Sequence, residues 1–188
     1  MSATFEVDHS RIATDPALAH FAEELDRLCP IDSVDAFNRY SRTACRLWRD
    51  RFPDRAGEIP DRFRKLREQI DSGGANVIRT RWGGVVVTLH EHPRVEKFLV
   101  VDSGHYLALE KHEQKVERLE STEGMGLVLW RNAGSGGLLA ELFLPSGVLQ
   151  LGPGIEHCLI GLENLVVFER SIDPKGMDQD LIFIYEPN

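Results

Sequence analysis

The second part of the chain alternates short apolar runs with turn-forming residues, and this rhythm limits the folds that it can adopt. The runs have the length of strands, and clusters of glycine and proline separate them. They cover residues 85–87, 98–101, 126–130, 138–144, 165–168 and 181–185. Because the chain contains no internal repeat, we expect one mainly antiparallel β-unit that closes into a sandwich or barrel.

Residues 1–74 have a helical pattern instead. Apolar side chains recur at helical spacing over residues 18–28, which predicts a first helix. A second helix is expected to begin near Asp32 or Ser33, which can cap it, and a third covers residues 60–70. We therefore predict a helical extension over residues 1–74, which packs on the barrel or extends a dimer interface, and a β-domain over residues 75–188.

Composition narrows the class of protein. A chain of 188 residues that is 42% hydrophobic can bury one sizeable core, but hardly two. Its net charge of −8 argues against nucleic acid or an anionic membrane as the main partner. No run approaches the roughly 20 apolar residues that cross a bilayer, and the three cysteines lack a CxxC pattern. We expect a soluble, cytoplasmic protein.

One segment concentrates residues that bind metal ions. It reads Gly104, five residues, Glu110, one residue, His112, four residues, Glu117, six residues, Gly124. Side chains alternate along a strand, so Glu110 and His112 point the same way. The polar residues 113–115 can turn the chain back, which returns Glu117 beside them from a neighbouring strand.

A second segment completes the set about forty residues later. Gly147, Pro153 and Gly154 mark turns, and His157 follows them directly. The predicted metal ligands are therefore Glu110, His112, Glu117 and His157. Alternation points His105 and Cys158 away from this face, and Cys158 is expected to be a buried structural thiol.

Charge arithmetic also favours a cation. Two carboxylates held within a few ångströms repel each other, and a divalent ion removes that conflict. Two carboxylates with two imidazoles form a harder donor set than three histidines and one glutamate. The expected ion is manganese, iron or zinc, with nickel as a further candidate. The alternatives are ligand-type side chains that face solvent and a barrel that has lost its metal.

The two segments resemble the paired motifs of the cupin superfamily. Gly104, Glu110, His112, Glu117 and Gly124 match the first motif in spacing, and Gly147, Pro153, Gly154 and His157 resemble the second with one residue missing. Within the superfamily, residues 78–186 resemble the type II phosphomannose isomerase domain through Trp82-Gly83, Lys97 and the spacing from His112 to Glu117. Glu110 stands where most cupins carry histidine and those isomerases carry glutamine.

The resemblance implies a jelly-roll β-barrel and a metal-dependent sugar or sugar-phosphate isomerase. The metal would stabilise an enediolate as a proton moves between neighbouring carbons. Lys97 would contact a substrate oxygen, and Arg170 would bind an anionic group of the substrate. Family likeness also implies a homodimer. Two alternatives stay open: a non-catalytic cupin that binds or senses a sugar or carboxylate, and a mononuclear iron dioxygenase.

Overall fold

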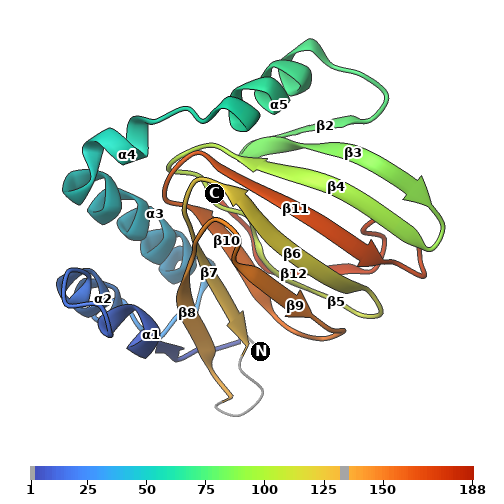
Figure 1. Cartoon of the computed structure of the whole chain (residues 1–188). Coiled ribbons are helices and arrows are strands. Elements are labelled where there is room, and N and C mark those ends of the chain that lie inside the picture. Colours follow the sequence, from blue (N-terminus) through green and yellow to red (C-terminus); the bar gives the residue numbers. More distant parts are fainter. Residues whose placement is uncertain (1–2, 132–135) are drawn as a thin grey trace.

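The computed structural model describes residues 3–131 and 136–188. Helices lie almost entirely before residue 73, and all but the first strand follow (Figure 1). The helices are α1 (Ser10–Ala13), α2 (Ala19–Asp26), α3 (Val34–Arg51), α4 (Pro53–Gly57) and α5 (Asp61–Ser72). The strands are β1 (Val7–Asp8), β2 (Val77–Thr80), β3 (Gly83–Glu91), β4 (Arg94–Val101), β5 (Leu109–His112), β6 (Val116–Glu123), β7 (Gly126–Arg131), β8 (Leu138–Phe143), β9 (Val148–Leu151), β10 (His157–Gly161), β11 (Leu165–Ile172) and β12 (Leu181–Tyr185).

The described strands form two sheets of six. The first sheet has the order β1-β8-β7-β10-β5-β12, and the second has the order β2-β3-β4-β11-β6-β9. All strand pairs are antiparallel except β1 with β8, which is parallel. The prediction of an antiparallel barrel is therefore confirmed. Its one departure is that the segment before the helices adds an edge strand to the barrel.

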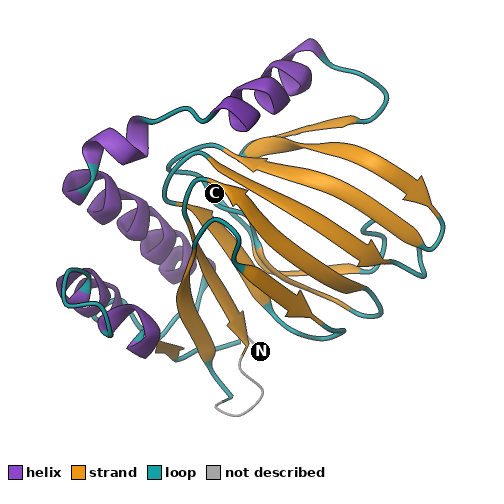
Figure 2. Ribbon diagram, in the orientation of Figure 1, coloured by secondary structure: helices purple, strands orange, loops and turns teal. Residues whose placement is uncertain are grey.

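Helices cover the outer faces of both sheets, and the inner faces meet between them (Figure 2). The outer face of the first sheet forms a core with α1, α2 and α3. The inner faces share a second apolar cluster that includes Leu99, Leu119, Leu159 and Val167. The helical extension thus packs on the barrel, as expected, whereas the domain division at residue 74 stays a prediction.

Helix α3 shows why the extension folds where it does. The Ser33 side chain accepts a hydrogen bond from the Ala36 backbone N–H, which caps the first turn as the sequence indicated. Phe37, Tyr40, Ala44 and Trp48 are all buried on one face of the helix at intervals of three, four and four residues. This face packs on the first sheet, directly behind β10.

Helix α5 covers the outer face of the second sheet. Its buried residues Phe63, Leu66 and Ile70 pack against valines of β3, β4 and β11. The helix approaches so closely that a Cβ at Gly84 would lie 2.9 Å from the Ile70 side chain. These strands are consequently apolar on both faces, and the sequence pattern alone does not reveal which face points inward.

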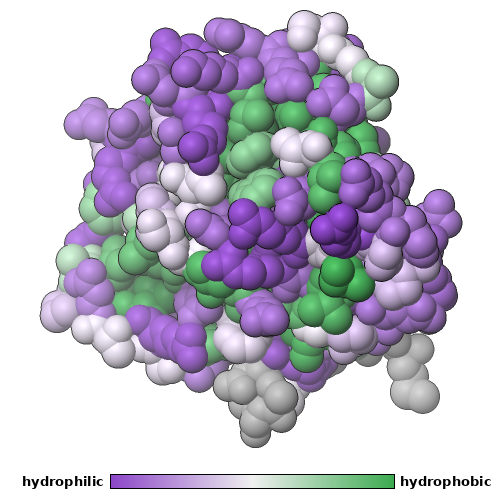
Figure 3. All heavy atoms as spheres, turned by 45° about the vertical axis from the view of Figure 1, so that its right-hand side comes forward, coloured by the Kyte–Doolittle hydropathy of each residue, from purple (hydrophilic) through white to green (hydrophobic). Residues whose placement is uncertain are grey.

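The surface retains several exposed apolar side chains. Figure 3 shows hydrophobic patches among hydrophilic side chains on one face of the molecule. The exposed large hydrophobic residues include Leu144, Val148, Ile172 and Phe183. The homodimer remains a prediction. None of the described helices combines the length and the apolar character that crossing a membrane requires.

Candidate metal centre

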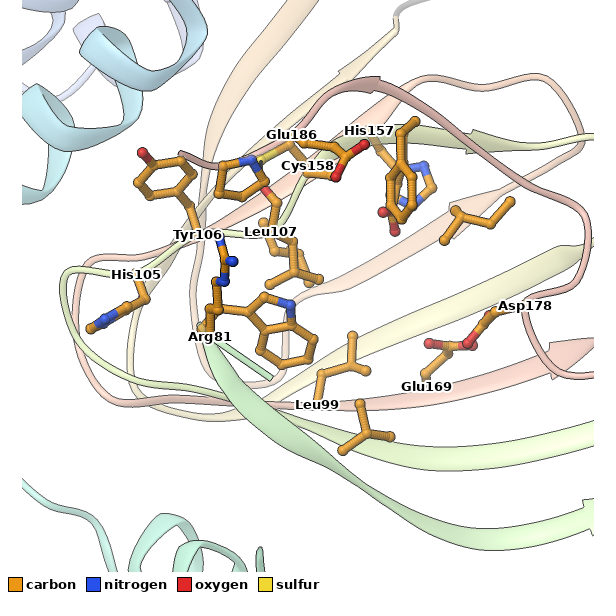
Figure 4. A pocket seen from close by; sticks show the side chains of 18 of the residues that line it. Arg81, Leu99, His105, Tyr106, Leu107, His157, Cys158, Glu169, Asp178 and Glu186 are labelled. Atoms are coloured by element: carbon orange, nitrogen blue, oxygen red, sulfur yellow. Dashed lines mark hydrogen bonds between the residues drawn. The ribbon is translucent and has the colours of Figure 1, made fainter. Parts of the chain in front are cut away.

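A cavity of about 630 Å³ lies between the two sheets, and the predicted ligands line it. Figure 4 shows polar side chains at both ends of it, with His157 and Glu186 between them. Glu169 and Asp178 lie at one end, whereas Arg81, His105 and Tyr106 lie at the other. Apolar side chains form the wall between them: Val85, Leu99, Leu107, Leu119 and Leu159.

Three of the four predicted ligands form a tight cluster. Glu110, His112 and His157 each offer one ligand atom, and these atoms all lie within 4.8 Å of one another. Glu110 and His112 share the inner face of β5, and His157 opens the adjacent strand β10, directly opposite Glu110 in register. Strand pairing within the first sheet therefore produces the cluster.

Glu117 approaches the same point from the facing sheet. One carboxylate oxygen lies 3.6 Å from His112 Nε2, and the other lies 3.2 Å from His157 Nε2. The structure thus brings all four predicted ligands together. The route differs from the expectation in one respect, because residues 113–115 carry the chain across to the second sheet rather than back beside β5.

The Nδ1 atom of each histidine, on the side of the ring away from Glu117, contacts an oxygen outside the cluster. His112 Nδ1 lies 2.7 Å from the buried Asp180 carboxylate, and His157 Nδ1 lies 3.0 Å from the Ile155 carbonyl oxygen. With a proton on Nδ1, the Nε2 atom of each ring, which faces Glu117, would be the nitrogen that binds a metal. Metal-binding histidines are commonly oriented by such second contacts.

Burial and mutual repulsion perturb the acids of the cluster. Desolvation, with Glu117 and Asp178 adding to it, raises the pKa of Glu110 to about 7. Burial opposes the charged form of His157, but Glu117 outweighs it and raises the pKa of His157 to about 9. Burial likewise opposes ionisation of Glu117, yet His157 and Lys115 hold its pKa well below the usual range.

These residues fit a divalent cation. The Glu117 carboxylate is buried, and its two oxygens face the two imidazoles. Buried ionised groups are costly unless charge balances them, and a cation bound by both carboxylates and both Nε2 atoms would do so. Carboxylate and imidazole ligands suit zinc, iron and manganese alike, so the donor set does not select one metal.

Lys115 is the unexpected member of the site. It precedes β6 in the polar stretch that was expected to form a turn, and its side chain is almost completely buried. Its ammonium lies 2.8 Å from Glu117, 2.7 Å from Glu169 and 2.7 Å from Asp178. Burial alone lowers the pKa of a lysine, but these three carboxylates outweigh it and raise the pKa of Lys115 above its usual range.

Lys97 lies in the same network. It sits on β4 opposite Glu169 of β11, and its ammonium contacts both Glu169, at 3.4 Å, and Asp178. Desolvation opposes ionisation of Asp178, but Lys97 and Lys115 outweigh it and lower the pKa of Asp178 to about 2. Asp178 also adopts a left-handed backbone, with φ of 58°, a conformation that aspartate tolerates.

Arg170 is the predicted site residue that the structure does not bring to the cavity. Its side chain is 55% exposed, pairs with Glu96 at 3.6 Å and lies over the Phe168 ring. The neighbouring Glu169 occupies the inner face instead, because β11 places Leu165, Val167 and Glu169 inward. A contact between Arg170 and a ligand in this cavity is excluded by that strand phase.

Several lining residues were not anticipated from the sequence. Asp178 comes from the loop between β11 and β12, and Glu186 follows β12. Asp180 of the same loop does not line the cavity but contacts His112. No spacing rule connects these positions to a motif about seventy residues earlier. Cys158 is a buried thiol, as expected, and lies 3.3 Å from the Leu107 carbonyl oxygen. It belongs to the apolar core that the outer face of the first sheet forms with α1, α2 and α3, which we call the helix-side core.

Comparison with known proteins gives matches in structure only. No protein-family model matches the sequence, and a search of the curated proteins gives no match. The capsular polysaccharide assembling protein CapF from Staphylococcus aureus is similar in structure with a TM-score of 0.50, at 15% identity over 58% of this chain and 34% of that chain. Procruciferin, an 11S globulin from Brassica napus, has a TM-score of 0.50 at 8% identity, over 60% and 30% of the two chains. L-ribose isomerase from Cellulomonas parahominis has a TM-score of 0.46 at 14% identity, over 54% and 68%.

The fold and the site together define the class. Two facing antiparallel sheets with a Glu/His cluster between them make this a double-stranded β-helix protein with a candidate metal centre. The chain is a cupin in fold, as its motif spacing indicated. It spans about a third of the CapF and procruciferin chains that it matches. At these identities the likeness concerns the fold alone.

Proposed function

We propose that this cupin is a divalent-metal-dependent enzyme that interconverts an aldose and a ketose, or their phosphates, through an enediolate. The observation that carries the proposal is the convergence of Glu110, His112, Glu117 and His157 inside a cavity large enough for a small substrate. The likeness of the sequence to the phosphomannose isomerase domain supplies the reaction class. Manganese, iron or zinc would provide Lewis-acid stabilisation of negative charge on the substrate oxygens.

Glu186 is the group that we assign as the proton carrier. Five carboxylates line the described part of the cavity: Glu110, Glu117, Glu169, Asp178 and Glu186. The first two belong to the metal centre, and lysines neutralise the next two. Glu186 has no cation within ion-pair distance among the described residues, and its side chain points toward His157 (Figure 4). A carboxylate so placed can remove a proton from one carbon and return it to the next.

Lys97 is the residue that we assign to a substrate oxygen. Its buried ammonium lines the cavity and contacts two carboxylates, which leaves one of its three N–H donors for a ligand. Lys115 has all three donors engaged by carboxylates, so its part is to hold Glu117, Glu169 and Asp178 in place.

The test is turnover in deuterium oxide. Protein loaded with manganese is incubated with aldose and ketose pairs and with their phosphates, and proton NMR follows interconversion and deuterium at the carbon next to the carbonyl. We expect both for at least one pair in the wild type. Glu186→Gln should lose at least about a hundredfold in rate, the usual contribution of a general base, with bound metal unchanged. No interconversion across the panel would contradict the proposed function.

The matched control is Glu68→Gln. Glu68 is exposed on α5, far from the lining residues, and its change alters the net charge by the same amount. It should leave both the rate and the metal content unchanged. If Glu68→Gln and Glu186→Gln behave alike, Glu186 is not the proton carrier.

One observation favours a second candidate, a mononuclear iron dioxygenase. The middle of the cavity is walled by valine and leucine side chains together with the partly buried Trp82. Such a wall offers few hydrogen-bond partners to sugar hydroxyls and suits a substrate with an apolar body. Oxygen consumption by the ferrous protein with such a substrate, without sugar interconversion, would favour this candidate. Metal and ligand binding without any turnover would instead favour a binding or regulatory cupin.

A further inference from the structure

The end of the cavity that lies away from the lysines is positively charged. Arg42, from α3, and Arg81, from the turn between β2 and β3, both line the cavity and are both exposed there. The metal centre and the lysine network lie farther in, where carboxylates surround the lysines. The cavity is therefore polarised along its length.

Neither arginine pairs with an acidic side chain. Among the described residues, no Asp or Glu carboxylate lies within 4 Å of the Arg42 or Arg81 guanidinium, and Arg42 contacts the main-chain oxygen of Asn188 at 3.5 Å. Arg79, two residues before Arg81, behaves differently: its Nε donates to the Ile70 carbonyl at 3.0 Å and so caps the end of α5. Arg79 is structural, whereas Arg81 is left available.

Both arginines are directed toward Tyr106. Arg42 lies beside the Tyr106 hydroxyl, where burial raises the pKa of Tyr106 and the guanidinium opposes that rise. Figure 4 shows the Arg81 side chain extending toward Tyr106. The Tyr106 hydroxyl itself donates to Asn38 at 2.6 Å, which anchors it to α3. Both positive charges therefore belong to the part of the cavity around Tyr106.

The nearest competing anion is directed elsewhere. Glu186 lines the cavity close to this region, and its backbone carbonyl accepts a hydrogen bond from Asn38 at 3.2 Å. Its carboxylate, however, points toward His157 rather than toward Arg81 (Figure 4). The positive end of the cavity consequently remains open to an anion from solution.

We propose that Arg42 and Arg81 form an oxyanion-binding subsite, which takes the phosphate or carboxylate end of a ligand whose other end reaches the metal centre. Guanidinium groups suit both anions because their N–H donors form paired, charge-assisted hydrogen bonds. The subsite gives the helical extension a role in ligand binding, since Arg42 belongs to α3. As a statement about the substrate it rests on the proposed function, but anion binding is measured without turnover.

The experiment compares two double variants of equal charge. Arg42→Gln with Arg81→Gln removes the subsite, and Arg39→Gln with Arg49→Gln removes two exposed arginines of α3 that do not line the cavity. Calorimetric titration with inorganic phosphate, and separately with acetate, measures binding, and elemental analysis measures metal content. Since a hydrogen bond to a charged group contributes roughly 1.5–3 kcal/mol, we expect the first double variant to bind at least about tenfold more weakly. The second should match the wild type, and all three proteins should hold equal metal.

Each outcome decides the matter. Binding of phosphate but not acetate, lost only in the first double variant, assigns a phosphate subsite, and the reverse assigns a carboxylate subsite. No anion binding by the wild type, or equal loss in both double variants, overturns the proposal. If the wild type binds anions at the subsite but converts no sugar, the proposed function is wrong and the subsite proposal is supported. If the wild type converts anionic sugars and the first double variant converts them equally well, the subsite proposal is wrong and the proposed function is supported.

Discussion

Two buried regions lie back to back across the first sheet, and they treat polar groups in opposite ways. The helix-side core buries neutral polar groups as hydrogen-bonded pairs, such as His9 with the Tyr40 hydroxyl at 2.8 Å. The cavity buries ionised groups, with Lys115 alone touching three carboxylates. Buried charges seldom stabilise a fold better than apolar residues would, so the cavity network points to function and the core to stability.

The acids around the metal centre and the lysine network outnumber the cations there. Glu110, Glu117, Glu169, Asp178 and Asp180 face two lysines and one histidine whose pKa is raised. A stable fold has no need of that excess, and a bound divalent cation would remove it. The predictions below separate the two regions by asking which changes affect stability, which affect metal binding, and which affect both.

The largest expected effect comes from Lys115→Met. The substitution leaves the buried carboxylates of Glu117, Glu169 and Asp178 without their shared cation, and breaking a buried ion pair costs about 3–5 kcal/mol. Urea unfolding should show this loss in the free energy of unfolding. Lys111→Met, one strand residue away from His112 and outside the ion pairs of the described residues, should change it by less than about 1 kcal/mol. If both substitutions lower the free energy of unfolding equally, the ion pairs of Lys115 do not stabilise the fold.

A loss of similar size without loss of metal is expected for Phe37→Ala. Phe37 is fully buried in the helix-side core, where truncating phenylalanine costs about 3–5 kcal/mol. Because the cavity lies on the other face of the sheet, the folded variant should bind as much metal as the wild type. Metal analysis at a temperature at which the variant is folded checks this. Reduced metal content there would show that the two regions are not separable.

Asp180→Asn should weaken metal binding with little effect on stability. Asp180 fixes the His112 ring through Nδ1, and loss of such an orienting contact commonly lowers metal affinity about 10–100-fold. Competition with a chelator measures the affinity. Asp35→Asn, an exposed change at the start of α3, should leave it unchanged. A variant at position 180 with wild-type affinity would show that His112 needs no orienting partner.

The smallest expected effect is a pH dependence from the helix-side core. Burial lowers the pKa of His9, although Asp26 opposes this, so the unfolded chain binds a proton more readily than the folded one. The contribution of neutral His9 to the free energy of unfolding is therefore fully present above a pH of about 6.5. It is lost as the pH falls toward the lower pKa that His9 has in the folded protein. His9→Gln should reduce the stability lost between pH 7 and pH 5 in urea unfolding. An identical loss in both proteins would show that His9 does not contribute.

The sequence predicted the barrel, the helical extension and the clustering of the candidate ligands because each has a local signature. Apolar runs between turns indicated the strands, and alternation placed Glu110 with His112. The prediction that Arg170 contacts a ligand failed because β11 is apolar on both faces beneath α5. Hydrophobicity therefore could not show which side chains of β11 face the cavity. Lys115 was missed because a polar stretch before a strand is typical of a surface turn. Asp178 and Glu186 reach the cavity through tertiary folding alone.

The central claim is that Glu110, His112, Glu117 and His157 hold one divalent cation, and elemental analysis tests it most directly. The protein is purified without chelator or immobilised nickel, together with His157→Ala, Glu110→Ala and the control Glu68→Gln. The account predicts about one equivalent of manganese, iron or zinc per chain in the wild type and the control, and its loss in both cavity variants. Wild-type protein that contains no metal and takes up none, or cavity variants that keep their metal, would contradict it.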